Sequence, residues 1–234
     1  MSFMRQTLTT MLGKTVKKAA QIRGGSGSAL PGLVIEKIDS DFVSRTLQQL
    51  PMGIALISGT NGKTTTTKIV VELLESQGLK VFTNRTGSNF TRGVAAALLG
   101  EVDLHGRINA DIAVLELDEA YAVHFVKAIK PNYCLLLNVM RDQLDRFGEI
   151  DNTAKLLHNV AINTTKCVVL NRDDPRLSSP DFVNDIKSPL RSFGVNPKYS
   201  QTFPSDDSLR SSEQNAAKLY ADDTSLEEFK DQHA

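Results

Sequence analysis

A short apolar run, a glycine-rich turn and a helix-forming segment meet near residue 60, and this junction restricts the fold more than any other feature. Residues 53–57 form an apolar run typical of a buried strand, and residues 64–77 have helical spacing that ends at Gly78. A Gly-Lys-Thr run between a strand and a helix is typical of loops that bind nucleotide phosphates. The loop is Gly59-Thr60-Asn61-Gly62-Lys63-Thr64.

Each residue type in this loop suits phosphate chemistry. The glycines let backbone N–H groups approach phosphate oxygens, and the start of a helix adds a partial positive charge. Lys63 supplies a mobile ammonium for the terminal phosphates, and Thr64 supplies a hydroxyl for Mg²⁺. We therefore expect ATP to be the ligand, with Lys63 also serving catalysis. The expected nucleotide-binding residues here are Gly59, Thr60, Asn61, Gly62, Lys63, Thr64 and Thr65.

Apolar and helical segments alternate through the rest of the chain. Continuous apolar strands separated by helices predict an α/β fold, with a mostly parallel sheet covered by helices on both faces. Ligands of such sheets bind beyond the carboxyl ends of the strands, where the phosphate loop lies. The further strands are expected at 80–83, 111–117, 133–138, 167–170 and 190–193, and the helices near 93–99, 119–129 and 151–162.

A carboxylate stands at the end of the expected third strand. Glu116 could reach a Mg²⁺ held by Thr64 and the phosphates, and one or two carboxylates suffice for Mg²⁺. Asp118 and Glu119 are better explained as acids that start the next helix. Asn171 follows the fifth strand, where a turn-forming asparagine before Asp-Asp-Pro is one explanation.

Composition excludes several classes of protein. Basic and acidic residues both number 27, so net charge gives no reason to expect a nucleic-acid partner. Cys134 and Cys167 each lie in an apolar run, which indicates buried thiols in a reducing cytoplasm. No apolar stretch approaches the ~20 residues that cross a bilayer.

The first 35 residues carry five bases and no acid. A transit peptide is one explanation, and a basic amphipathic helix packed on the domain surface is another. The same charge would suit contact with the inner face of an anionic membrane. The apolar side of such a helix would be Phe3, Leu8, Met11, Leu12 and Val16.

Three regions are expected along the chain. Residues 1–50 would hold the basic helix, a flexible Gly/Ser break at 24–32 and a short helix from residue 39. Residues 51–195 would form the ATP-binding domain, and residues 196–234 a polar tail without fixed structure.

The loop and several later segments resemble one enzyme family. Two residues separate Gly59 from Gly62, and a threonine run follows Lys63; both features resemble the Mur ligases and the related folylpolyglutamate synthases. Within the Mur ligase family, four further segments resemble the MurT group, which is the ligase subunit of lipid II isoglutaminyl synthase. These segments are Leu30-Pro31-Gly32, Leu117-Asp118-Glu119, residues 141–151 and residues 171–175.

This resemblance implies an ATP-dependent amide ligase in peptidoglycan synthesis. Its substrate would be lipid II, whose D-glutamate α-carboxylate would be activated as an acyl phosphate and amidated to D-isoglutamine. A separate GatD-like glutaminase subunit would supply the ammonia. Glu116 matches the family's metal-binding glutamate and would serve catalysis with Lys63, and Asn171 matches a position near the adenine. Asn89 has two explanations, contact with the substrate or an ordinary place in a loop. Gln143 and Phe147 replace expected histidines, so a second, histidine-bound metal is not implied.

Two features of the MurT group are missing from this sequence. It has no Cys-x-x-Cys pair, so we expect no zinc, and only a polar segment follows Gly194 where the group continues into a closing domain. A nucleotide-binding module without turnover is therefore the main alternative to an active ligase subunit. A folylpolyglutamate synthase-like ligase is a third; Gln143, Phe147 and residues 149–151 favour the MurT group over it.

Overall fold

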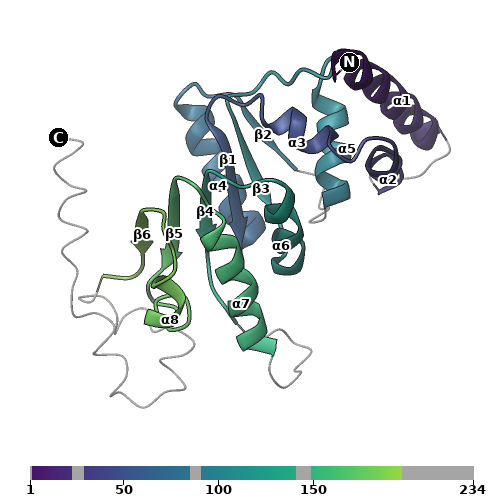
Figure 1. The fold of residues 1–234 in the computed structure, drawn as a ribbon. Helices are drawn as coiled ribbons and strands as arrows, with labels where there is room; N and C mark the ends of the chain where they lie inside the picture. Colours follow the sequence, from purple (N-terminus) through teal and green to yellow (C-terminus); the bar gives the residue numbers. More distant parts are fainter. Residues whose placement is uncertain (1, 23–28, 85–90, 141–148, 197–234) are drawn as a thin grey trace.

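A six-stranded parallel sheet forms the centre of the molecule (Figure 1). The computed structural model describes residues 2–22, 29–84, 91–140 and 149–196. The strand order is β2-β3-β1-β4-β5-β6, and every neighbouring pair is parallel. This confirms the expected α/β class. The strands are β1 (Gly53–Ser58), β2 (Val81–Thr83), β3 (Ile112–Glu116), β4 (Tyr133–Leu136), β5 (Cys167–Asn171) and β6 (Leu190–Phe193).

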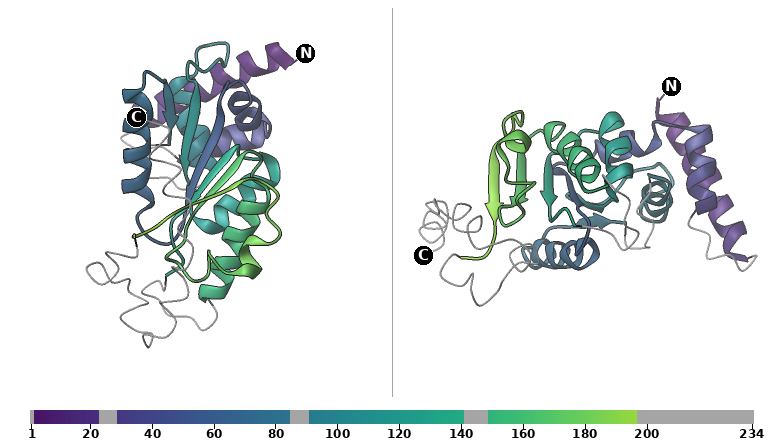
Figure 2. Two further views of the ribbon diagram at one scale, coloured as in Figure 1. Left: turned by 90° about the vertical axis from the view of Figure 1, so that its left-hand side faces the viewer. Right: turned by 90° about the horizontal axis from the view of Figure 1, so that it is seen from below.

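Helices cover both faces of the sheet (Figure 2). On one face Val71 of α4 packs against Ile57, Val114 and Leu137. The helices α5, α6 and α7 contribute to a separate, larger core that includes the residues of the other face. Because both faces are covered, all five residues of β3 are buried, whereas the edge strand β6 is exposed throughout. These helices are α4 (Lys63–Ser76), α5 (Thr91–Glu101), α6 (Glu119–Ala128) and α7 (Glu149–Ile162).

The strand order brings three loops together at one edge of the sheet. The chain passes from β1 to β2 and β3 on one side and then to β4 on the other, so β1 lies between β3 and β4. Ile57 of β1 pairs with Glu116 and with Leu135, so these three strands end at the same level. The loops after β1, β3 and β4 therefore meet where ligands of open parallel sheets bind.

The prediction of a flexible segment at 24–32 is wrong for residues 29–32. Residues 29–32 begin helix α2 (Ala29–Ile38), which precedes α3 (Phe42–Leu47); a short α8 (Pro180–Val183) was also not foreseen. Pro31 lies in the first turn of α2, where a missing N–H does no harm. A Cβ on Gly32 would lie 2.1 Å from the backbone oxygen of Arg92, so glycine permits the close packing of α2 on α5.

The N-terminal segment is helical, but it packs through a different face from the one expected. In α1 (Ser2–Ile22) the apolar residues Leu8, Met11 and Leu12 are exposed. The buried face is small or polar and consists of Gln6, Thr9, Thr10 and Gly13.

Several expectations lie outside the described residues. They concern the first part of the break (24–28), Asn89, the segment 141–148 with Gln143 and Phe147, and the tail 197–234. The division of the chain into three regions stays a prediction. Among the helices that the structure describes, none combines the length and hydropathy needed to cross a membrane.

Candidate functional site

The phosphate loop leaves β1 in a conformation that depends on glycine. Gly59 has φ +139° and Gly62 has φ +82°, both in the region that L side chains rarely adopt. A Cβ on Gly59 would also lie 3.0 Å from the backbone nitrogen of Asn138, in the segment after β4. The loop therefore passes closely over the end of β4.

Asn138 holds the phosphate loop through hydrogen bonds with Thr60 and Asn61. Its backbone oxygen accepts from the N–H of Thr60 at 3.0 Å. Its side-chain oxygen accepts from the N–H of Asn61 at 2.8 Å, and its amide nitrogen donates to the oxygen of Asn61 at 3.1 Å. These two loop N–H groups therefore already donate to Asn138. An incoming phosphate would accept mainly from the first N–H groups of α4.

Helix α4 begins directly after the loop. Gly62 is its N-cap residue and has no side chain with which to cap the helix. The first N–H groups of any α-helix lack intrahelical acceptors, and here they belong to Lys63, Thr64 and Thr65. Thr64 and Thr65 are exposed, so this end of the helix can receive an anion.

The ammonium of Lys63 folds back over the loop. It donates to the oxygens of Gly59 at 2.5 Å and Thr60 at 3.0 Å. It also lies 3.4 Å from Asp118 and 3.9 Å from Glu119. These acids are the N-cap and first residue of α6, as expected, but their contact with Lys63 was not foreseen. A polyphosphate would compete with both carboxylates for the ammonium.

Thr64 and Glu116 meet as the sequence suggested. The Thr64 hydroxyl donates to Oε1 of Glu116 at 2.8 Å, and Glu116 is only 8% exposed. A hydroxyl oxygen beside a carboxylate is the type of hard oxygen donor set that Mg²⁺ prefers.

A second asparagine holds the backbone of Glu116. The side-chain amide of Asn84, which follows β2, donates to the oxygen of Glu116 at 2.7 Å and accepts from its N–H at 2.9 Å. Asn84 is buried, so these bonds are shielded from water. Asn84 and Asn138 thus fix the backbones on opposite sides of the site, and sequence patterns gave no sign of either role.

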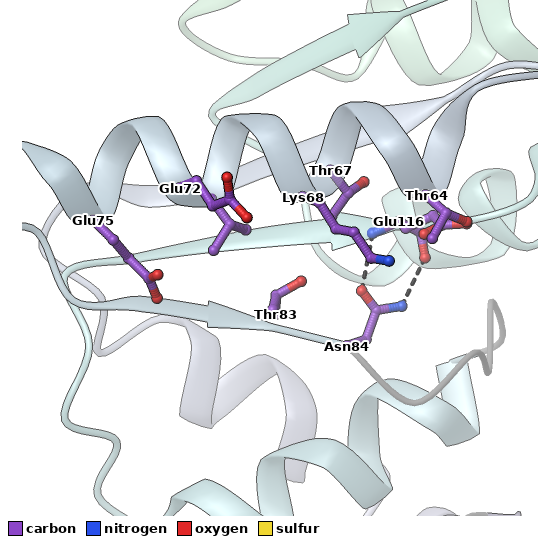
Figure 3. A pocket seen from close by; sticks show the side chains of 9 residues that line it. Thr64, Thr67, Lys68, Glu72, Glu75, Thr83, Asn84 and Glu116 are labelled. Atoms are coloured by element: carbon purple, nitrogen blue, oxygen red, sulfur yellow. Dashed lines mark hydrogen bonds between the residues drawn. The ribbon is translucent and has the colours of Figure 1, made fainter.

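A pocket opens beside the Thr64–Glu116 pair, between α4 and β2 (Figure 3). Its volume is about 670 Å³, within the range of small-molecule sites. Figure 3 shows Lys68 turned toward Asn84 at the same end of the pocket as Glu116, with Glu72 and Glu75 farther along α4. Lys68 is four residues after Thr64, so helical spacing could have placed it on the same side.

Asn171 ends β5 and uses its side chain locally. Its amide nitrogen donates to the oxygen of Leu137 at 3.0 Å, and its side-chain oxygen accepts from the N–H of Asp173 at 3.0 Å. This is the turn-forming role that the sequence also allowed. Contact with an adenine stays a prediction.

The cysteines have no activated environment. Both are free thiols; Cys134 is buried and Cys167 is half-buried, so the expectation of two buried thiols is wrong for the second. Burial raises the pKa of Cys134 to about 12 and also raises the pKa of Cys167. Neither thiol forms a ready nucleophile near neutral pH. Among the described residues, no group of three or more His, Cys, Asp or Glu side chains could hold a metal ion.

Replacing Asn138 by alanine should weaken ATP binding. The change removes two hydrogen bonds to Asn61, each worth about 0.5–1.5 kcal/mol, and frees the loop to move. We expect calorimetry to give an affinity roughly 3- to 10-fold lower. Asn132→Ala is the matched control, because Asn132 Oδ1 accepts from the N–H of Ile54 at the opposite end of the strands. It should lower the melting temperature but leave ATP affinity unchanged; equal affinity losses in both variants would contradict the role of Asn138.

The sequence matches the family model of the Mur ligase middle domain over residues 57–230. It is 34% identical over 186 residues to the lipid II isoglutaminyl synthase (glutamine-hydrolyzing) subunit MurT of Staphylococcus aureus (strain COL), covering 78% of this chain and 40% of that protein. The subunit of the same name from Streptococcus pneumoniae (strain ATCC BAA-255 / R6) is 34% identical over 184 residues, covering 77% and 40%. The chain thus spans about 40% of the length of these relatives.

The solved structures show the same fold. The MurF ligase from Thermotoga maritima, crystallised in complex with ADP, superposes with a TM-score of 0.57 and 22% identity. The match covers 70% of this chain and 36% of that one.

Proposed function

The chain belongs to the Mur ligase family, and from that premise we propose that residues 51–195 form the ATP-binding part of an ATP-dependent amide ligase. The hydrogen bond between Thr64 and Glu116 is the observation that carries the proposal. It joins the first turn after a phosphate loop to a carboxylate at the end of a neighbouring strand. A magnesium nucleotide needs both groups at one place.

The residues of the site fit Mg²⁺ and the phosphates of ATP. Thr64 and Glu116 would hold the ion through oxygen atoms, and Lys63 would move from Asp118 and Glu119 to the terminal phosphates. The start of α4 would donate N–H groups to the same phosphates. Bound Mg²⁺ would neutralise phosphate charge and orient the terminal phosphate.

The proposed acceptor is the α-carboxylate of D-glutamate in lipid II. A carboxylate oxygen attacks the terminal phosphorus of ATP, ADP leaves, and an acyl phosphate forms. Ammonia then attacks the acyl carbon, inorganic phosphate leaves, and the amide of D-isoglutamine remains after the nitrogen loses a proton. The names of the relatives from Staphylococcus and Streptococcus support this substrate.

Ammonia would come from a separate, GatD-like glutaminase subunit. The relatives are named as subunits of glutamine-hydrolyzing enzymes, which supports a partner of this kind. Glutamine hydrolysis commonly needs an activated thiolate, and the raised pKa values of Cys134 and Cys167 argue against either thiol in this role. We place the complex in the cytoplasm at the inner face of the membrane, beside its lipid-linked substrate.

The test has a cellular arm and a purified arm. Deleting the gene should replace D-isoglutamine by D-glutamate in the cell-wall peptides, as read by mass spectrometry; unchanged wall peptides with a new requirement for folate products would favour the folylpolyglutamate synthase alternative. In the purified arm, the 234 residues receive Mg-ATP, lipid II, glutamine and the glutaminase subunit. We expect nucleotide binding without amidation, because amide formation needs reactants aligned away from water by more of the protein than these residues supply. Isoglutamine formation here would contradict that expectation.

A further inference from the structure

Helix α1 turns an apolar stripe away from the domain. Leu8, Met11 and Leu12 are 65%, 46% and 46% exposed, whereas surface helices usually bury such residues. Their spacing of three and four residues puts them on one side of the helix. Leu104, which follows α5 and is 56% exposed, joins Met11 in lining a shallow groove of about 540 Å³.

Directional contacts on the other side of α1 fix this orientation. Gln6 donates to the oxygen of Gly106 at 2.8 Å, and Thr9 donates to Asp39 at 3.0 Å. A Cβ on Gly13 would lie 2.7 Å from the side chains of Ile35 and Leu99, so the helix sits very close to its neighbours there. Turning the helix to bury its apolar stripe would break these contacts.

Two lysines, Lys14 and Lys18, line the groove beside the exposed stripe. Lys18 is exposed, and the ammonium of Lys14 donates to the oxygen of Val102 at 2.7 Å. Lys17 lies on the packed side of α1, where a Cβ on Gly100 would come within 2.8 Å of its Nζ. The carboxylate of Asp103, which precedes Leu104, accepts from the N–H groups of His105 and Arg107 and is therefore held within its own turn. The groove therefore combines apolar side chains with the positive charges of Lys14 and Lys18.

We propose that this face of α1, together with Leu104, binds an anionic membrane surface. The apolar side chains enter the boundary between headgroups and acyl chains, and the lysines contact anionic headgroups. A second copy docked through the same stripe would set lysines opposite lysines, which disfavours it as the occupant. The inference rests on the proposed function only for its biological reason, which is access to a lipid-linked substrate.

Vesicle co-sedimentation tests the surface directly. Vesicles of phosphatidylglycerol and phosphatidylcholine should bind the chain, and Leu8→Glu with Met11→Glu should weaken binding by about tenfold or more. Reversing the exposed groove lysine, Lys18→Glu, should weaken binding to the anionic vesicles and reduce its sensitivity to salt. Leu73→Glu is the matched control, because Leu73 on α4 is 57% exposed and lies away from α1.

Two results would overturn the proposal. One is equal sedimentation of the unmodified chain and the stripe variants. The other is light scattering that shows a dimer which the stripe substitutions dissociate, with no vesicle binding, because a second copy would then cover the face. ATP affinity is measured on every variant and should be unchanged, so failure on vesicles leaves the proposed ATP site standing.

Discussion

Lys63→Ala should lower the affinity for Mg-ATP by about 10- to 100-fold, because a charged hydrogen bond to phosphate is worth about 1.5–3 kcal/mol. In the structure the Lys63 ammonium also balances Asp118 and Glu119 at 3.4 and 3.9 Å. In the variant, Lys63 would no longer offset the repulsion between these carboxylates and bound phosphates. Isothermal titration calorimetry measures the effect.

The control for Lys63 separates position from net charge. Lys127→Ala removes the same charge from the exposed last turn of α6, away from the loop, and should leave affinity unchanged. Thermal unfolding should show that Lys63→Ala stays folded, since the ammonium contacts loop oxygens and the two acids and not the apolar core. An unaltered affinity in a folded Lys63→Ala protein would remove Lys63 from the site.

Glu116→Gln should raise the Mg²⁺ concentration needed for tight ATP binding by about tenfold or more, because an amide oxygen is a poorer ligand for Mg²⁺ than a carboxylate. Glutamine keeps the shape and can still accept from the Thr64 hydroxyl. Binding of ATP without Mg²⁺ should therefore not weaken. Mg²⁺ titrations at fixed ATP, followed by calorimetry, distinguish these effects.

Glu72→Gln is the matched control for Glu116. Glu72 lines the same pocket but lies along α4 away from Thr64 (Figure 3). Its loss should leave the Mg²⁺ titration unchanged. Superimposable titrations for Glu116→Gln and the unmodified chain would mean that Glu116 only stabilises Thr64.

The sheet was predictable because most of its strands are short apolar runs bounded by turn residues; the exposed edge strand β6 is the exception, with apolar residues only at Leu190 and Phe193. All six strands lie within about a residue or two of their expected ranges. The start of helix α2 was predicted as a flexible segment because Leu30-Pro31-Gly32 follows a Gly/Ser run, and such a sequence is typical of a loop. Its helical state depends on packing against α5, and a pattern within one segment does not contain that contact.

The orientation of α1 was mispredicted for a related reason. Apolar periodicity says which residues share a side of a helix, but it does not say what that side meets. Here Thr9, Thr10 and Gly13 allow a closer approach to α2 and α5 than leucines would, and Gln6 adds a specific hydrogen bond. The small face is therefore the packed one.

The main site contact was predictable, whereas its supports were not. Strand ends converge in a parallel sheet, so Glu116 and Thr64 could be brought together from sequence, and their hydrogen bond agrees. Asn84 and Asn138 act through bonds to backbones far away in sequence. An asparagine after a strand otherwise looks like an ordinary turn residue.

The most direct test of the account is a calorimetric titration of the unmodified chain with ATP, once with Mg²⁺ and once with a chelator. If the loop after β1, Thr64 and Glu116 form a magnesium-nucleotide site, binding should saturate at one ATP per chain and be tighter with Mg²⁺. The absence of saturable binding in the presence of Mg²⁺ would contradict the central claim.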